Sequence, residues 1–277
     1  MVADVIPEAP DSATLVLFTG NDHLDYKPGH FLSIKPHQFT ALDRFIKYFE
    51  DLKGKRETAR AYSLSSAPHE RHLAITVKEE RYVSGVTRYP PLLSPLLVWR
   101  TARGTRMVVT GFGGPYTLPD DIESRTDHLL HVCAGSGIVP NMSILKHALG
   151  TGMKLRHTLI YGNKTWPDVI FRRQLEALAA RHPGRLTVVH ALSREPGAAS
   201  HGPGVRAGRV TEDLIREHVM DPNGVEVFAC GPAVSHWDRQ AARDKGVKPE
   251  PRFLEGVTAA LAAIGVPASR IHRESYG

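Results

Sequence analysis

The amino-acid sequence predicts two domains of different class, an antiparallel β-barrel followed by a doubly wound parallel α/β sheet. Up to residue 117, short runs of alternating apolar and polar residues are separated by glycine and proline, which is typical of antiparallel strands. After residue 127, apolar runs alternate with stretches of helical periodicity, which is typical of a parallel sheet. The polar segment PDDIESRTD at 119–127 separates the two patterns. We therefore expect domains over 1–120 and 128–277.

The first domain is expected to be a barrel or sandwich of short strands. Its candidate strands are ATLVLF, HFLSI, RAYSLSS, HLAITVK and RMVVTGF. Apolar residues at three-to-four spacing over 38–53 instead predict an amphipathic helix inserted between two strands. These residues are Phe39, Leu42, Phe45, Ile46 and Phe49. A second stretch, PPLLSPLLVWR at 90–100, predicts a helix or turn that closes the barrel.

The second domain is expected to alternate strands with helices along its length. Its candidate strands are HLLHVCA, LRHTLIYG, LTVVHAL and VEVFACG, and its candidate helices are NMSILKHAL, DVIFRRQLEALAARH and TEDLIREHV. A further helix is expected over 252–264. In a sheet of this class, ligands bind at the carboxyl ends of the strands. Side chains that follow these strands are therefore the candidates for a binding site.

The composition limits the classes of partner and the cellular compartment. A net charge of +6 and an isoelectric point near 9.4 favour an acidic partner, either a nucleic acid or an acidic protein. Lysine and arginine are scattered rather than clustered, which argues against nucleic acid. The amino-terminal segment is acidic where a signal peptide would be basic, and no apolar run is long enough to cross a membrane. We therefore expect a cytoplasmic protein.

Cysteine and histidine usage argues against metal centres. The sequence has two cysteines, Cys133 and Cys230, whereas an iron–sulfur cluster of the usual kind needs four thiolates. Two cysteines also fit a reducing compartment better than a disulfide framework. His128 and His131 lie three apart on a candidate strand, so their side chains face opposite sides and do not bind one ion together. The sequence contains no HxxxH or CxxC motif, and we expect no metal site.

The segment AGSGIVP follows a candidate strand and begins a candidate helix. In such a turn, backbone N–H groups and the helix dipole can hold a pyrophosphate. Gly135 and Gly137 fit this role, but Pro140 stands where the common dinucleotide motif has a third glycine. The next strand ends in YGNK (161–164), without an acid for a ribose diol. A tight strand-to-helix turn that binds no ligand is the alternative.

Two further segments end strands at the same edge of the predicted sheet. In ALSRE, Ser193 lies beside Arg194, and a hydroxyl next to a guanidinium suits a phosphomonoester, which favours NADP over NAD. In ACGP, the thiol of Cys230 is followed by the turn residues Gly231 and Pro232. The alternatives are a solvated Ser-Arg pair and an ordinary buried cysteine.

Seven segments, taken in their order along the chain, resemble the motifs of the ferredoxin–NADP reductase superfamily. They are RAYS (60–63), GVT (85–87), GFGGPYTL (111–118), GSGIVP (135–140), SRE (193–195), CGP (230–232) and RESY (273–276). The resemblance spans nearly the whole chain. It implies an antiparallel flavin-binding barrel followed by a nicotinamide-dinucleotide domain. Four features depart from the family pattern. They are the long insertion at 38–53, Phe112 in place of a proline, the extra helix over 252–264, and Gly277 after Tyr276.

The resemblance implies a flavin site on the first domain. Arg60 would pair with the flavin phosphate, Tyr62 would pack against the isoalloxazine, and Ser63 would lie near flavin N5. Strand alternation places Arg60 and Tyr62 on one face and Ser63 on the other. The remaining implied flavin contacts are Ala61, the backbone of Thr76 and Val77, and a pyrophosphate loop of Gly85, Val86 and Thr87. This loop favours FAD, and FMN is the alternative.

The resemblance also implies a nucleotide site on the second domain. The implied nucleotide contacts are Gly135, Ser136, Gly137 and Pro140 at the pyrophosphate, Asn163, and Ser193 and Arg194 at the 2′-phosphate. Cys230, with Gly231 and Pro232 after it, would meet the nicotinamide. Glu274 and Tyr276 match the closing pattern of the family, in which the aromatic ring covers the flavin.

The implied activity is reduction of FAD by NADPH, with NADH as the alternative donor. Electrons would then pass singly to a separate acidic carrier, such as a ferredoxin, a flavodoxin or an oxygenase component. Ser63 and Cys230 would position the rings, and Glu274 would handle charge or a proton. A reductase of free flavin, quinone or another small acceptor is the alternative enzyme. A non-catalytic nucleotide- or nucleic-acid-binding protein is the alternative from another class.

The basic charge of the chain also suggests where an acidic carrier would dock. Candidate residues on or beside the 38–53 helix are Arg44, Lys47, Lys53, Lys55 and Arg56. The alternative is that this helix is solvated and only covers the barrel.

Overall fold

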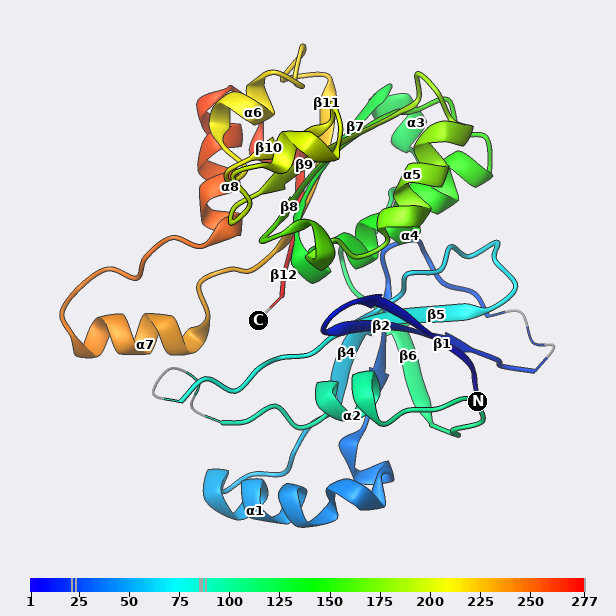
Figure 1. Cartoon of the computed structure of the whole chain (residues 1–277), viewed down its shortest axis with the longest axis vertical. Coiled ribbons are helices and arrows are strands. Elements are labelled where there is room, and N and C mark those ends of the chain that lie inside the picture. Colours follow the sequence, from blue (N-terminus) through cyan, green and yellow to red (C-terminus); the bar gives the residue numbers. More distant parts are fainter. Residues whose placement is uncertain (21, 23, 85–86, 88, 277) are drawn as a thin grey trace. The chain divides into compact units, whose positions relative to one another are not determined.

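The structure is a computed structural model that describes residues 1–277 apart from 21, 23, 85, 86, 88 and 277 (Figure 1). The chain forms two compact units, Met1–Thr117 and Leu118–Gly277. Each unit has its own cluster of buried apolar side chains. None of the described helices is long and apolar enough to cross a membrane.

The first unit contains two three-stranded antiparallel sheets. One has the strand order β1-β2-β5, and the other has the order β4-β3-β6. The strands are β1 (Val2–Ala9), β2 (Ser12–Leu17), β3 (Phe31–Ile34), β4 (Arg60–Ser63), β5 (Leu73–Lys78) and β6 (Val109–Gly113). A bridge between Leu64, directly after β4, and Ile75 of β5 connects the two sheets. The antiparallel fold expected for the first half of the sequence is therefore confirmed.

Strand β1 is absent from the predicted strands. Its sequence, VADVIPEA, contains two acids and a proline, and Val2 is its one buried residue. Pairing with β2, from Val2 opposite Leu17 to Ala9 opposite Ser12, forms the strand. Since this pairing is a long-range contact, the local sequence pattern does not predict it.

The core of the first unit contains alternate residues of both sheets. Leu15 of β2, Leu32 and Ile34 of β3 and Ile75 of β5 are fully buried. Helix α2 (Ser94–Trp99) adds Leu97 to this core. The helix or turn predicted over 90–100 is thus a helix over its second half. Because residues two apart in a strand face the same side, each sheet offers one apolar face to the core.

The predicted helix over 38–53 is confirmed in part. Two 3₁₀ turns, η1 (Pro36–Gln38) and η2 (Thr40–Leu42), precede α1 (Asp43–Lys53). Gly54 ends the helix with a left-handed backbone, φ 63°, which glycine adopts without strain. Ile46 and Phe49 face the unit and are buried, whereas Phe45 is 57% exposed. Phe45 is thus periodic with the buried residues but lies on the outer side.

The second unit is built on a six-stranded parallel sheet with the order β10-β9-β8-β7-β11-β12. The strands are β7 (His128–Ala134), β8 (Arg156–Asn163), β9 (Leu186–Leu192), β10 (Val205–Ala207), β11 (Val225–Gly231) and β12 (Ile271–Ser275). This confirms the predicted doubly wound sheet. The chain proceeds outward from β7 to β10 and then continues on the other side of β7 with β11. The point where the order reverses, between β7 and β11, is where such sheets bind ligands.

Helices cover both faces of the parallel sheet (Figure 1). Helices α6 (Glu212–Arg216) and α8 (Phe253–Ala263) pack against one face, and buried residues of β7, β8, β9 and β11 share their core. The other face carries α4 (Ile138–Gly150) and α5 (Arg172–Arg181). The short helices are α3 (Ile122–Arg125), η3 (Gly135–Gly137), η4 (Trp166–Asp168), η5 (Ala198–His201) and η6 (Ala268–Arg270).

Two helices separate β11 from β12. The helix predicted over 252–264 is confirmed as α8, but α7 (His236–Asp244) was not predicted. Ser235 accepts a hydrogen bond from the Asp238 N–H, and Asp238 accepts one from the Ser235 N–H. This reciprocal capping is a recognisable helix start, and it is the signal that could have predicted α7.

Candidate functional site

Strand β4 carries the RAYS segment and pairs with β3 in antiparallel register. Arg60 lies opposite Ile34, Tyr62 opposite Leu32 and Ser63 opposite Phe31. Arg60 and Tyr62 are half-buried, Ala61 is exposed and Ser63 is buried. The strand therefore presents a guanidinium and a phenol on one face, as strand alternation predicts.

The Arg60 guanidinium is held by neighbouring residues of its own segment. Its Nη2 donates to Glu57 Oε2 at 2.5 Å, and its Nη1 donates to the Thr58 carbonyl at 2.6 Å. Burial raises the pKa of Glu57, but hydrogen bonds from Lys53 and Arg60 outweigh this effect, and the net pKa lies below its usual value. Arg60 thus has a fixed position next to a charged, buried carboxylate.

The phenol of Tyr62 is kept protonated by its surroundings. Burial raises the pKa of Tyr62 above its ordinary value, and the charge of Glu80 acts in the same direction. The ring is therefore a neutral surface whose hydroxyl can donate a hydrogen bond. Packing of this ring against a flavin stays a prediction.

The other residues expected to contact a flavin are already hydrogen-bonded within the first unit. The Thr76 hydroxyl lies 2.7 Å from that of Thr14 and donates to Ser65 at 3.0 Å, and Val77 is buried. The Thr87 hydroxyl donates to the Val83 carbonyl at 2.8 Å. The predicted contacts Gly85 and Val86 lie outside the described residues. A role for these segments in flavin binding stays a prediction.

The GFGGPYTL segment is fixed by aromatic packing. Phe112, which stands in place of a proline, packs on Tyr26 with ring centroids 5.4 Å apart. Burial raises the pKa of Tyr26 to about 12. Tyr116 is buried, and a Cβ at Gly29 would collide with its carbonyl oxygen. Phe112 therefore contributes a contact between aromatic rings that a proline would not supply.

In the second unit, the glycine turn lies at the switch point of the sheet. Strand β7 ends at Ala134, the turn η3 covers Gly135–Gly137, and α4 follows directly. A Cβ at Gly137 would collide with the Cys230 carbonyl oxygen of β11. The structure thus brings the glycine turn and the CGP segment into contact. Pro140 lies in the first turn of α4, where its missing N–H costs no helical hydrogen bond.

A buried polar network beneath the turn was missed by sequence reasoning. Asn141 Nδ2 donates to the Gly137 carbonyl at 2.9 Å, and Asn141 Oδ1 lies 2.8 Å from His131 Nδ1. His131 Nε2 lies 3.2 Å from His157 Nδ1. Burial lowers the pKa of His131 to about 4, so the ring is neutral. His131 thus positions Asn141, which in turn holds the Gly137 carbonyl of the turn. The signal in the sequence that could have indicated this network is the polar residue Asn141 directly after the GSGIVP segment.

The loops after β8 and β9 are joined to each other at the carboxyl edge of the sheet. The Ser193 and Arg194 N–H groups donate to the carbonyls of Asn163 and Lys164, at 2.9 and 2.8 Å. Ser193 and Arg194 are exposed, and the Arg194 guanidinium has no hydrogen bond or ion pair among the described residues. The amide nitrogen Asn163 Nδ2 is buried and has no hydrogen-bond partner in this part of the chain. The edge therefore offers unused donors where a nucleotide was predicted.

Glu195 continues this connection between the loops. Its Oε2 accepts from the Trp166 N–H at 2.6 Å, and its Oε1 lies 2.5 Å from His201 Nε2. The rings of Trp166 and His201 stack with their centroids 4.8 Å apart. The Arg172 guanidinium carbon Cζ lies 5.3 Å from the centroid of the Trp166 ring. Sequence reasoning missed this cluster, because its members are far apart in the chain.

Cys230 lies in the middle of the ligand edge but is not exposed on it. It is in register with Cys133 of β7 and Glu274 of β12. Burial raises the pKa of the Cys230 thiol well above its usual value, and the charge of Glu274 adds to this. The side chain is therefore a neutral thiol rather than a thiolate, and it has no exposed surface. The Tyr276 N–H donates to the Gly231 carbonyl at 3.0 Å, which extends the pairing of β12 to the tail.

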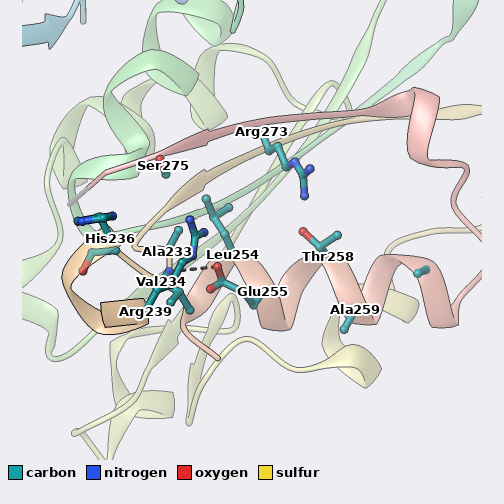
Figure 2. A pocket seen from close by; sticks show the side chains of 12 residues that line it. Ala233, Val234, His236, Arg239, Leu254, Glu255, Thr258, Ala259, Arg273 and Ser275 are labelled. Atoms are coloured by element: carbon teal, nitrogen blue, oxygen red, sulfur yellow. Dashed lines mark hydrogen bonds between the residues drawn. The ribbon is translucent and has the colours of Figure 1, made fainter. Parts of the chain in front are cut away.

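A pocket of about 820 Å³ opens near the ends of β11 and β12 (Figure 2). Its lining includes two arginines, Arg239 and Arg273, and one histidine, His236. Arg273 is in register with Ala229, which packs on the α8 side of the sheet, whereas Glu274 is in register with Cys230. The pocket thus lies on the sheet face opposite to the Cys230 side chain. The predicted site residues do not line it.

Comparisons with known proteins agree with this architecture. The model of the oxidoreductase NAD-binding domain matches residues 131–235. The chain is 33% identical, over 99% of its length, to the ferredoxin reductase component of 3-ketosteroid-9-alpha-monooxygenase from Mycolicibacterium smegmatis. It is 30% identical, again over 99% of its length, to the component of that name from Rhodococcus rhodochrous. The chain spans 64% of the length of each relative.

Solved structures show the same fold. The flavohem-like FAD/NAD-binding domain of nitric oxide dioxygenase from Vibrio cholerae matches with a TM-score of 0.73 and 22% identity, over 100% of this chain and 97% of that one. Ferredoxin-NADP+ reductase from Plasmodium falciparum matches with a TM-score of 0.65 and 18% identity, over 99% and 94%. The resemblance of the chain to the ferredoxin–NADP reductase superfamily, predicted from its sequence, is confirmed. The matched model is named as an oxidoreductase domain and the relatives as reductase components, which agrees with the enzyme class predicted from the sequence.

The predicted site residues of the chain lie in three groups. Arg60, Tyr62 and Ser63 share one strand of the first unit. Gly135, Ser136 and Gly137 form the turn that meets Cys230. Asn163, Ser193 and Arg194 form a separate group at the ends of β8 and β9.

Proposed function

We propose that this chain is an NADPH-dependent FAD reductase that passes electrons to a separate carrier protein. The observation that carries the proposal is the match, over 99% of this chain, to proteins named as ferredoxin reductase components of a monooxygenase. The fold and the unused donors at the sheet edge support it. A bound flavin would accept a hydride from a nicotinamide and release electrons one at a time.

The first unit has residues that fit a flavin phosphate and ring. A guanidinium has five N–H donors, and the contacts of Arg60 with Glu57 and Thr58 use at most three of them. The remaining donors can bind a phosphate, while Glu57 keeps the side chain in place. Tyr62 offers a half-buried, uncharged ring on the same strand face. Arg60 would therefore anchor the phosphate, and Tyr62 would orient the flavin ring. FAD is preferred over FMN because the GVT segment resembles a pyrophosphate loop.

The second unit has residues that fit a phosphorylated dinucleotide. The Gly137 turn leaves no room for a side chain, and α4 begins there with its N–H groups directed toward the loop. The buried Asn163 amide lacks a partner in the described chain, and the Arg194 guanidinium is exposed. Ser193 and Arg194 would bind the 2′-phosphate, which is the reason for preferring NADPH over NADH.

The residues near Cys230 would control the nicotinamide end. The Cys230 thiol is neutral and fully buried, so a nicotinamide ring would reach it only if the segment that covers it moves, and Glu274 lies beside it on β12. Cys230 would set the position of the nicotinamide ring, and Glu274 would hold or move a proton. Ser63 would position the flavin, and the Tyr276 ring would cover it until the nicotinamide enters.

The proposed acceptor is an acidic iron–sulfur or flavin protein, because the chain has a net charge of +6. Steady-state NADPH oxidation would be measured with a [2Fe–2S] ferredoxin, free riboflavin, FMN and a quinone as acceptors. We expect the ferredoxin to be reduced with the highest kcat/KM, with a rate that falls as salt is added. Faster reduction of free flavin or quinone would contradict the proposed acceptor. Failure to bind FAD would contradict the reductase itself.

A further inference from the structure

Helix α1 is apolar on two sides, and the described structure covers one of them. Ile46 and Phe49 are buried, at 3% exposure each. Phe45, Tyr48 and Leu52 are 57%, 60% and 53% exposed. Single exposed apolar residues are ordinary, but three on one short helix form a patch. In Figure 1, α1 lies at the outer end of the first unit.

The three exposed side chains form one continuous stripe. Their spacing of three and four residues places them above one another along the helix. This spacing is also that of the contact positions where two helices pack side by side. We refer to Phe45, Tyr48 and Leu52 as the outer stripe.

Contacts on the other sides of α1 fix the outer stripe in its outward position. Lys53 Nζ lies 4.8 and 4.7 Å from the ring centroids of Phe49 and Tyr89, and it donates to Glu57 at 2.5 Å. Glu50 Oε1 lies 2.8 Å from His37 Nε2 and accepts from the Glu57 N–H at 2.8 Å. The helix therefore does not rotate to bury the stripe without losing these contacts.

Two opposite charges flank the outer stripe on one side. Arg44 and Asp51 are both exposed, and they lie seven residues apart, which places them on the same flank. Neither has an ion-pair partner among the described residues. If two copies of α1 pack antiparallel with Tyr48 at the centre, Phe45 of each copy faces Leu52 of the other. Arg44 of each copy then faces Asp51 of the other.

We propose that the outer stripe is a two-fold interface through which two copies of this chain associate by antiparallel packing of α1. The stripe and its flanking charges are self-complementary, as an interface between identical copies requires. An acidic carrier fits less well, because the flank carries both signs and the ammonium of Lys53 is already paired with Glu57. An anionic membrane also fits less well, because helices that lie on membranes carry basic polar faces and here Asp43 and Asp51 are exposed.

The expected association is weak. An 11-residue helix is roughly 16 Å long, so a single helix pair buries less than the about 800 Å² per partner of a standard interface. Dimerisation should therefore depend on concentration in roughly the micromolar range.

Sedimentation velocity of the whole chain over a range of concentrations tests the proposal. We expect a monomer–dimer equilibrium in which Tyr48→Glu raises the dissociation constant by at least about tenfold, because two carboxylates then meet at the centre. Arg44→Asp and Asp51→Arg should each weaken the dimer by several-fold, and the double variant should restore it. Lys47→Asp, the same charge change at an exposed position off the stripe, should have little effect. Circular dichroism of each variant checks that it is folded.

If the double variant dimerises as well as the original chain, the result supports pairing of two copies. A partner of a different sequence would keep its own charges, so swapping Arg44 and Asp51 would not restore its binding. A chain that stays monomeric at all concentrations would overturn the proposal. A dimer that is insensitive to Tyr48→Glu and to both charge variants would also overturn it. Binding of the monomer through this stripe to phosphatidylserine vesicles or to an acidic ferredoxin would assign the surface to that partner instead.

Discussion

The two units differ in how far their candidate site residues are already satisfied. In the first unit, Arg60 is bound to Glu57, and the Thr76 hydroxyl is bound to Thr14 and Ser65. At the edge of the second unit, the Asn163 amide and the Arg194 guanidinium have no partners in the described chain. A ligand of the first unit must share existing contacts, whereas a ligand of the second unit can satisfy open donors. We infer that the second unit is the more preformed of the two sites.

Acid destabilisation of the second unit is the largest effect that we expect. The buried histidines of the described chain all lie in this unit. Burial lowers the pKa of His131 and of His190 to about 4 and lowers that of His157. Unfolded histidine titrates near 6.5, so the unfolded state binds more protons between about pH 6.5 and 4. The free energy of unfolding therefore has its full value above about pH 6.5 and decreases as the pH falls toward about 4. For His131 alone, the decrease is on the order of 3 kcal/mol.

Urea unfolding from about pH 7 to about pH 4.5 measures this loss. In His131→Phe, the free energy of unfolding at neutral pH should be lower, because Asn141 loses a hydrogen-bond partner. Its decrease with falling pH should be shallower, because one titrating group is removed. An equally steep dependence in the variant would contradict the role of His131.

Gly137→Ala tests the contact between the glycine turn and β11. Its Cβ would collide with the Cys230 carbonyl oxygen, so the turn or the strand must move. We expect a loss of stability of roughly 2–3 kcal/mol together with weaker NADPH binding, measured by urea unfolding and by KM. Gly197→Ala is the matched control, because Gly197 has an ordinary φ of −84°, like the −61° of Gly137, but open space around it. If both variants lose the same stability, the Cys230 contact is not what requires glycine at 137.

Arg60→Ala tests whether the first unit binds a phosphate through a shared guanidinium. We expect FAD binding to weaken by about 1.5–3 kcal/mol, because a charge-assisted hydrogen bond is lost. Flavin release measured by fluorescence gives the dissociation constant. The control is Arg56→Ala, an exposed arginine four residues earlier. Full flavin occupancy in Arg60→Ala would show that this residue serves only to pair with Glu57.

Arg194→Ala tests the smallest of these effects. The preference for NADPH over NADH, taken as the ratio of kcat/KM values, should narrow by about tenfold, which corresponds to about 1.4 kcal/mol. Arg209→Ala, another exposed arginine of the same unit, is the control. An unchanged ratio would place the 2′-phosphate contact away from Arg194.

The sequence predicts those features that local periodicity encodes. Alternating runs identify β2 to β6, and the strand–helix alternation identifies the parallel sheet with the glycine turn after β7. Long-range contacts are not visible in this way. The pairing of β1 with β2, the Asn141 support beneath the turn and the Glu195 connection between two loops all depend on the folded chain.

Helix α1 shows a second limit of sequence reasoning. Its periodicity predicts an amphipathic helix but does not say how much of the apolar side the protein covers. Phe45 and Phe49 have equal weight in the pattern, yet one is exposed and the other buried. The predicted docking surface for an acidic carrier also loses one of its free charges. Lys53, one of its residues, is already bound to Glu57 and lies over two aromatic rings.

Anaerobic titration of the purified chain with NADPH, after incubation with FAD, tests the central claim most directly. The account predicts that the chain binds one FAD and that about one equivalent of NADPH bleaches the flavin absorbance. NADH should require a higher concentration for the same effect. A chain that binds no FAD, or that binds FAD but leaves it oxidised when NADPH is added, would contradict the assignment of this protein as a reductase.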